Sequence, residues 1–144
     1  MQREFRSRAG VRGFTLVEVL VTVVIFSVGL LGLAGLQATG IKLNHSSMLR
    51  SQATLLAYDI VDCMRANQAN VADYALTLAG APPSTPTSQA DQDLVDWIGN
   101  LAANLPSGDG SVTLNGNRVT VVVAWDDARN SNIPAKTMTV VSDI

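Results

Sequence analysis

The segment from Phe14 to Ala38 contains 25 residues and a single charged side chain, Glu18. As a helix rising about 1.5 Å per residue it would be about 37 Å long, which exceeds the roughly 30 Å hydrocarbon core of a bilayer. A buried core helix of this kind would be unusually apolar for a chain of 144 residues. We therefore expect one membrane-spanning helix over residues 14–40.

Charge is distributed unevenly on the two sides of this segment. Residues 1–13 hold four arginines and one glutamate, a formal +3, whereas the rest holds six basic and eleven acidic residues, a formal −5. Basic flanks stay on the cytoplasmic side, so the expected topology is a single span with the N-terminus inside and the C-terminal part outside. A basic patch can also bind nucleic acid, but no aromatic interleaving or recognition helix follows it and the remainder is acidic, so no nucleic-acid partner is expected.

Two simpler explanations compete for the apolar segment. A secretory signal peptide has a shorter core, about 7–15 residues, and an A-x-A-like cleavage site; the best site here, Leu36-Gln37-Ala38, is poor. A plain membrane anchor fits the length but explains neither Glu18 nor the Gly13-Phe14 junction. A carboxylate at mid-membrane costs roughly 2.5–3.5 kcal/mol and tends to be functional, although one near the cytoplasmic end can also simply reach the headgroups.

The residues around the junction resemble the type IV pilin signature. A basic leader ends in Gly13, Phe14 follows, and Glu18 comes four residues after Phe14, at the start of the apolar helix. The resemblance implies that a prepilin peptidase cuts after Gly13 and N-methylates Phe14, and that Glu18 is the fifth residue of the mature chain. The freed amine needs a partner in an apolar environment, and pairing with Glu18 of a neighbouring subunit would offset the desolvation of both groups.

This resemblance divides the chain into three parts. They are a basic leader peptide (1–13), a transmembrane N-terminal helix (14–40), and a periplasmic or extracellular globular domain (41–144) that includes the second half of the long helix. The implied partners are prepilin peptidase, other minor and major pilins, the inner membrane and the pilus assembly machinery. Before assembly the protein would lie in the inner membrane, and after assembly on the pilus at the cell surface.

The outer part of the chain predicts an α+β fold. Residues 41–68 lack proline and glycine and carry an apolar stripe typical of an amphipathic helix; its members are Leu49, Ala53, Leu56, Ile60, Cys63 and Asn67. After a loop at 80–90, Ser88 and Asp91 predict a capping box for a short helix that ends near Leu105. Three strands follow at 112–114, 119–125 and 137–141, with a hairpin at Asn115-Gly116 and a loop over 126–134. A long helix packed on a small antiparallel sheet is a pilin-like architecture.

Three segments of the sequence resemble one particular group within the type IV pilins. Residues 26–37, 55–68 and 119–127 resemble the type IV pilus modification family of minor pilins. The chain departs from common pilin patterns at Gly35, where major pilins often carry proline, and in its cysteines. Cys63 is the single cysteine, so the C-terminal disulfide loop of many pilins is absent and the adhesive roles tied to that loop do not carry over.

No pattern in the sequence predicts a catalytic, metal or cofactor site. His45 is the single histidine and lacks a patterned nucleophile and carboxylate. Asp126-Asp127 offers too few ligands for a metal, and no phosphate-binding glycine loop is present. Cys63 is expected to be a small buried apolar residue, and Trp97 and Trp125 are expected in the core. The chain is therefore not expected to be an enzyme.

The leading functional hypothesis is a minor type IV pilin that takes part in pilus assembly at initiation or at the tip. A minor pseudopilin of a type II secretion system has nearly the same N-terminal signature and is the first alternative. A secreted or membrane-anchored binding domain with an ordinary signal is an alternative of a different class. The mature N-terminus separates the last from the others, because a pilin would begin at methylated Phe14 and an ordinarily secreted domain at Thr39.

Overall fold

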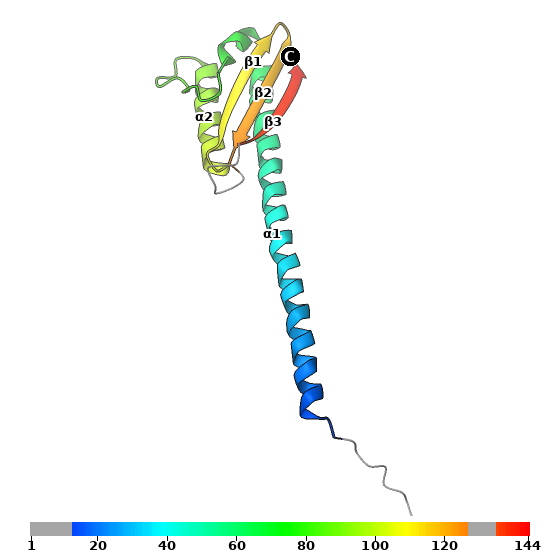
Figure 1. Ribbon diagram of the computed structural model, residues 1–144. Coiled ribbons are helices and arrows are strands. Elements are labelled where there is room, and N and C mark those ends of the chain that lie inside the picture. The colour runs from blue at the N-terminus through cyan, green and yellow to red at the C-terminus, as the bar shows by residue number, and fades with distance from the viewer. Residues whose placement is uncertain (1–12, 127–134) are drawn as a thin grey trace, which may run out of the picture. The chain divides into compact units, whose positions relative to one another are not determined.

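The computed structural model describes residues 13–126 and 135–144 (Figure 1). In chain order its elements are α1 (Leu16–Ala66), the 3₁₀ helix η1 (Gln68–Tyr74), α2 (Gln89–Asn104), β1 (Asp109–Asn115), β2 (Arg118–Trp125) and β3 (Lys136–Asp143). The chain divides into two compact units, residues 1–42 and 43–144. Most of the expected leader and of the loop before β3 lies outside the described residues.

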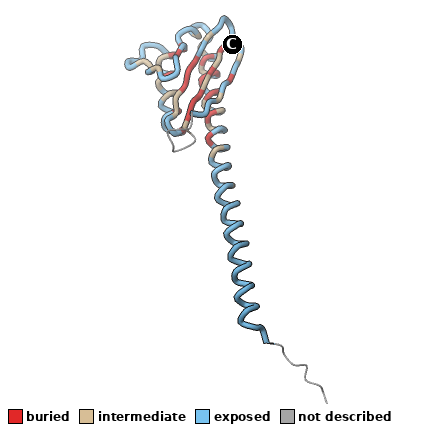
Figure 2. Tube along the Cα trace, viewed as in Figure 1, coloured by how far each residue is buried: buried red, intermediate tan, exposed pale blue. Residues whose placement is uncertain are grey.

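In the first unit, the described chain consists of a short non-helical start and the beginning of α1. Every residue from 13 to 39 is exposed, which Figure 2 shows as the pale blue part of the helix. This stretch contains leucine, valine, isoleucine and phenylalanine in a continuous run. Because the chain itself buries none of these side chains, their apolar surface requires another environment, such as a membrane or neighbouring helices.

The second unit has the α+β architecture that the sequence predicts. The antiparallel strands lie in the order β1-β2-β3, and the part of α1 from Leu43 onward packs against this sheet together with α2. Along β2 every second side chain is buried, from Val119 through Val121 and Val123 to Trp125, as expected for a sheet with one face covered. These residues meet the buried face of α1 and the apolar face of α2 in one core.

The buried face of α1 differs from the stripe expected from the sequence. The fully buried residues of α1 are Leu49, Ala53, Ala57, Ile60, Val61 and Met64. Leu56, Cys63 and Asn67, which we expected on this face, are half-buried. Leu56 and Cys63 pack against the border of the core. The small side chains Ala53 and Ala57 are fully buried, because the positions of the strands and α2 decide which side of the helix is covered.

Helix α2 starts as the sequence predicts. The Ser88 hydroxyl accepts a hydrogen bond from the Asp91 N–H at 3.1 Å, and the Asp91 carboxylate accepts one from the Ser88 N–H at 3.1 Å. Two backbone donors of the first turn thereby gain partners. The same carboxylate also accepts from the Thr87 N–H, and these hydrogen bonds lower the pKa of Asp91.

Trp97 ties α2 to both neighbouring layers of the core. Its indole N–H donates to the Leu56 carbonyl of α1 at 2.8 Å. Its ring lies so close to β1 that a Cβ placed on Gly110 would be 2.3 Å from the ring. A glycine is therefore required at position 110 to let the strand pass beneath the tryptophan.

The hairpin between β1 and β2 is one residue displaced from the expected turn. Asn115 pairs with Arg118, so Gly116 and Asn117 form the two-residue loop. Gly116 has a φ of +60° and Asn117 is not among the residues with positive φ, which is the pattern of a type II′ turn with glycine first. Asn115 thus ends the strand and does not occupy the first loop position.

The segment after α1 contains structure that the sequence did not reveal. Helix α1 ends at Ala66, two residues before the expected end, and η1 follows it. Leu76 then forms an antiparallel bridge to Val112 at the outer edge of β1. Tyr74, the last residue of η1, is fully buried. Its hydroxyl donates to the Asp93 carboxylate at 2.5 Å and accepts from the Asn67 amide at 3.3 Å.

The Tyr74 hydroxyl predicts a pH dependence of stability. Burial and the hydrogen bond to Asp93 raise the pKa of Tyr74 from 10.0 to about 12. The folded protein therefore holds the phenolic proton more tightly than the unfolded chain does. The contribution to the free energy of unfolding is complete below about pH 10 and is lost as the pH rises toward 12.

Tyr74→Phe should remove this alkaline dependence and lower stability at pH 7 by about 1–2 kcal/mol, because a charge-assisted hydrogen bond is lost. Urea unfolding of the full chain in detergent, measured from pH 7 to pH 12, checks both effects. Tyr58→Phe is the matched control, since Tyr58 is exposed on α1. An identical alkaline decline in Tyr74→Phe and wild type would contradict the assignment.

Candidate processing site

The Gly13–Phe14 junction lies in non-helical chain directly before α1. Residues 13–15 have no helical assignment, and the Phe14 side chain is 83% exposed. A Cβ placed on Gly13 would meet no atom within 4 Å, and Gly13 does not have a positive φ. The fold of this chain therefore does not itself require glycine at position 13. Gly13 and Phe14, on either side of the peptide bond, are both exposed.

Thr15 marks the start of the helix. Its carbonyl accepts hydrogen bonds from the Glu18 N–H at 3.1 Å and from the Val19 N–H at 3.2 Å, and its hydroxyl also accepts from the Glu18 N–H, at 3.3 Å. A side-chain oxygen bonded to the N–H three residues later is the geometry of an N-cap. Thr15 thus separates the non-helical junction from α1.

Glu18 lies in the first turn of α1 and is exposed. A negative charge is favourable there because the N-terminal end of a helix carries a partial positive charge. Its carboxylate makes no hydrogen bond or ion pair with the described residues. In particular, it does not bond back to the Thr15 N–H, so its oxygens remain available to a group outside this chain.

The helix that begins at this site is apolar enough to cross a membrane. By length and composition α1 is a candidate membrane span, and its most apolar part is not buried within the protein. The structure thus brings together, within six residues, an accessible peptide bond, a helix start and a carboxylate without an internal partner.

Comparison with known protein families gives one match at this site. Residues 8–34 match the prokaryotic N-terminal methylation motif, the prepilin signal of type IV pilin-like proteins. No curated protein and no solved structure matches the chain. The motif supports a type IV pilin-like protein or pseudopilin that prepilin peptidase processes. Together with the apolar helix it indicates anchoring in the inner membrane.

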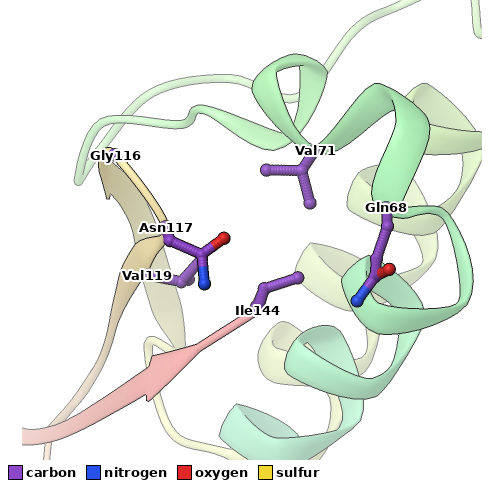
Figure 3. Close-up of a pocket in the computed structure, with 6 residues that line it drawn as sticks. All are labelled: Gln68, Val71, Gly116, Asn117, Val119 and Ile144. Carbon is purple, nitrogen blue, oxygen red and sulfur yellow. The ribbon is translucent and has the colours of Figure 1, made fainter.

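Two cavities in the described part of the second unit are lined by few titratable side chains. One, of about 260 Å³, lies between η1, the β1–β2 turn and the end of the sheet (Figure 3). Amide and aliphatic side chains line it, among them Gln68, Asn117 and Ile144, and none of its lining side chains is titratable. A second, more open one of about 410 Å³ is lined by His45 without a carboxylate or nucleophile.

The remaining residues considered from the sequence are structural or lie partly outside the described chain. His45 is exposed, as expected. Asp126 follows β2 and donates its N–H to the Pro106 carbonyl; Asp127 is not described.

Trp97 and Trp125 are 2% and 3% exposed and belong to the core, which confirms the prediction that both lie there. Within residues 13–126 and 135–144, no three His, Cys, Asp or Glu side chains are grouped to hold a metal.

Cys63 was expected to be a small buried apolar residue, and it is half-buried, packed against the border of the core. Burial and, next, the nearby Asp93 charge raise the pKa of its thiol. At neutral pH the thiol is therefore protonated and poorly nucleophilic.

Replacing Cys63 with alanine should lower stability by at most about 1–2 kcal/mol, because a small, half-buried side chain is removed. Chemical unfolding of the full chain in detergent measures the loss, and Met64→Ala is the comparison. Met64 is fully buried one position further on and should cost about 2–5 kcal/mol. A Cys63→Ala protein that fails to accumulate, or a wild-type dimer that reduction dissolves, would reveal an intermolecular role for the thiol.

Gly13→Leu should leave an uncleaved precursor in the inner membrane. The side chain has free space in this chain, so folding and insertion should be unchanged and the defect should arise in the peptidase. Intact mass and the amount of folded protein in membranes are the two measurements. Gly99→Leu is the control, because a Cβ at Gly99 also meets no atom within 4 Å and the position is remote in sequence from the junction. Normal mature mass in Gly13→Leu would refute the site.

Proposed function

We propose that this protein is a minor type IV pilin, cut by prepilin peptidase between Gly13 and Phe14 and N-methylated on Phe14. The observation that carries the proposal is the match of residues 8–34 to the methylation motif at an exposed, non-helical junction. An ordinary secretory signal would not require the Gly13–Phe14 sequence or the carboxylate of Glu18. The architecture of the second unit, a helix packed on a small antiparallel sheet, agrees with this class.

The assignment to a minor pilin rests on sequence similarity. Residues 26–37 and 55–68, and more loosely 119–127, are similar to the type IV pilus modification protein PilV. A subunit of this kind enters the filament in few copies, at initiation or at the tip. Its partners are then the peptidase, other minor and major pilins, and the assembly machinery in the inner membrane.

Processing changes the electrostatics of the N-terminus. Removing residues 1–13 deletes a formal +3, which holds this end on the cytoplasmic side of the membrane. The new terminal amine is a cation beside an apolar helix. The Glu18 carboxylate has no partner among the described residues, so it can pair with the amine of a neighbouring subunit, which offsets two desolvation costs and fixes the axial register between subunits.

The mature N-terminus tests the assignment to the class. Protein purified from membranes or pili should begin at Phe14 and have the mass of residues 14–144 plus one methyl group. A mature chain that begins at Thr39 would establish ordinary secretion instead. Deleting the gene then separates the two filament types, since loss of surface pili identifies a pilin and loss of enzyme secretion identifies a type II pseudopilin.

Glu18→Ala should be cleaved and inserted normally but should enter filaments poorly. Its carboxylate opposes membrane insertion weakly, so removing it does not harm insertion. In the filament the partner amine would be left as an unpaired charge in a region of low dielectric, which is costly. Co-purification with sheared pili, relative to the amount in membranes, measures the defect.

Glu18→Asp is the matched variant because it keeps the charge and shortens the side chain by one methylene group. It should incorporate better than Glu18→Ala. If Glu18→Ala reaches the wild-type level in pili, Glu18 is an interfacial carboxylate without a role in assembly.

A further inference from the structure

The hydrogen bonds of Thr15 indicate a role for this residue that the methylation motif does not describe. We propose that Thr15 is a positioning residue for leader removal: as the N-cap it keeps the start of α1 at Leu16 and thereby holds the Gly13–Phe14 bond in non-helical chain. This inference rests on the proposed cleavage between Gly13 and Phe14, and it concerns how the junction is presented.

A peptide group inside a helix is a poor protease substrate because its N–H and C=O are committed to the helical hydrogen bonds. If α1 began one turn earlier, the Gly13–Phe14 bond would lie within its first turn. In the structure the helix begins two residues after the bond, and Phe14 is exposed. The peptidase therefore meets a main chain whose polar groups are free.

Two features make an earlier start of the helix a real alternative. Next to a membrane, unpaired backbone groups are costly, so an apolar helix gains by extending until its N–H groups have partners. The Glu18 carboxylate does not hydrogen-bond the Thr15 N–H in the described chain, so the second half of a capping box, which would reinforce the boundary, is missing.

Two features oppose this extension. The Glu18 N–H donates to the Thr15 carbonyl at 3.1 Å and also to the Thr15 hydroxyl at 3.3 Å. The hydroxyl therefore adds a side-chain acceptor to the first turn while Thr15 itself stays outside the helix. Gly13 acts in the same direction, since glycine is the poorest helix former after proline. The hydroxyl is thus the side-chain group within the described start of α1 that, beside the backbone bonds, favours a helix start at Leu16.

The experiment uses full-length precursor in detergent micelles and purified prepilin peptidase. Thr15→Val removes the acceptor while keeping the branched shape, and Thr15→Ser and Thr15→Asn restore an acceptor that caps helices well. Thr22→Val is the control, because Thr22 donates its hydroxyl to the Glu18 carbonyl within α1 and caps nothing. The two readouts are kcat/KM for leader removal and backbone chemical shifts of residues 13–15 in the uncleaved precursor.

Thr15→Val should be cut about 2- to 30-fold more slowly, the range expected for losing an N-cap, and its residues 14 and 15 should acquire helical shifts. The serine and asparagine variants should be cut at rates close to wild type with non-helical shifts, and Thr22→Val should match wild type in both readouts.

Three results would overturn the inference while leaving the processing site intact. They are unchanged cleavage of Thr15→Val, slower cleavage without helical shifts, and failure of both Thr15→Ser and Thr15→Asn to restore the rate. The second of these would mean that the peptidase contacts the hydroxyl directly. A wild-type precursor that is not cut between Gly13 and Phe14 would instead refute the proposed function.

Discussion

Packing of one face of α1 against the sheet and α2 is the interaction on which the second unit depends. The described residues form one sheet of three strands, without a second sheet to pack against it. The buried side chains of β2 are therefore covered by helices. Ala53 and Ala57 are fully buried on that face of α1. Ile60 and Met64 are larger buried side chains of the same helix and belong to the same core.

The polar contacts of this core join elements that are distant in sequence. Trp97 donates from α2 to the Leu56 carbonyl of α1, and Tyr74 donates from η1 to Asp93 of α2. Each bond satisfies a group that would otherwise be buried without a partner, and an unsatisfied group of this kind costs about 1–3 kcal/mol. The exception is Trp125, whose indole N–H is buried and has no hydrogen-bond partner among residues 13–126 and 135–144; its ring contributes to the core through apolar contact.

The apolar side chains of the first unit, unlike those of the second, are not buried by the described chain. Its side chains from residue 14 to 39 are exposed in the isolated chain, so the apolar run cannot be explained by folding of this protein alone. A membrane, and later the neighbouring subunits of a filament, would be the solvent for this surface. The proposed processing site lies at the edge of that surface, where Phe14 is exposed; cleavage there would create a terminal amine that needs a counter-charge.

The sequence by itself determined the features that depend on neighbours along the chain. The apolar span, the junction around Gly13 and Phe14, the capping box of Ser88 and Asp91, and the three strands all follow from local composition and spacing. Thr15 belongs to the same group, because Thr-x-x-Glu before an apolar run is a readable capping signal that we did not weigh.

Only the tertiary structure decided which groups meet across the chain. The burial of Met64 in place of Cys63, the bond from Tyr74 to Asp93 and the bridge of Leu76 to Val112 arise when α1, α2 and the sheet pack together. The hairpin loop moved by one residue because the pairing of β1 with β2 sets its register. Helical and strand periodicity specifies that a face is apolar, whereas the elements that cover it decide which of its residues are buried.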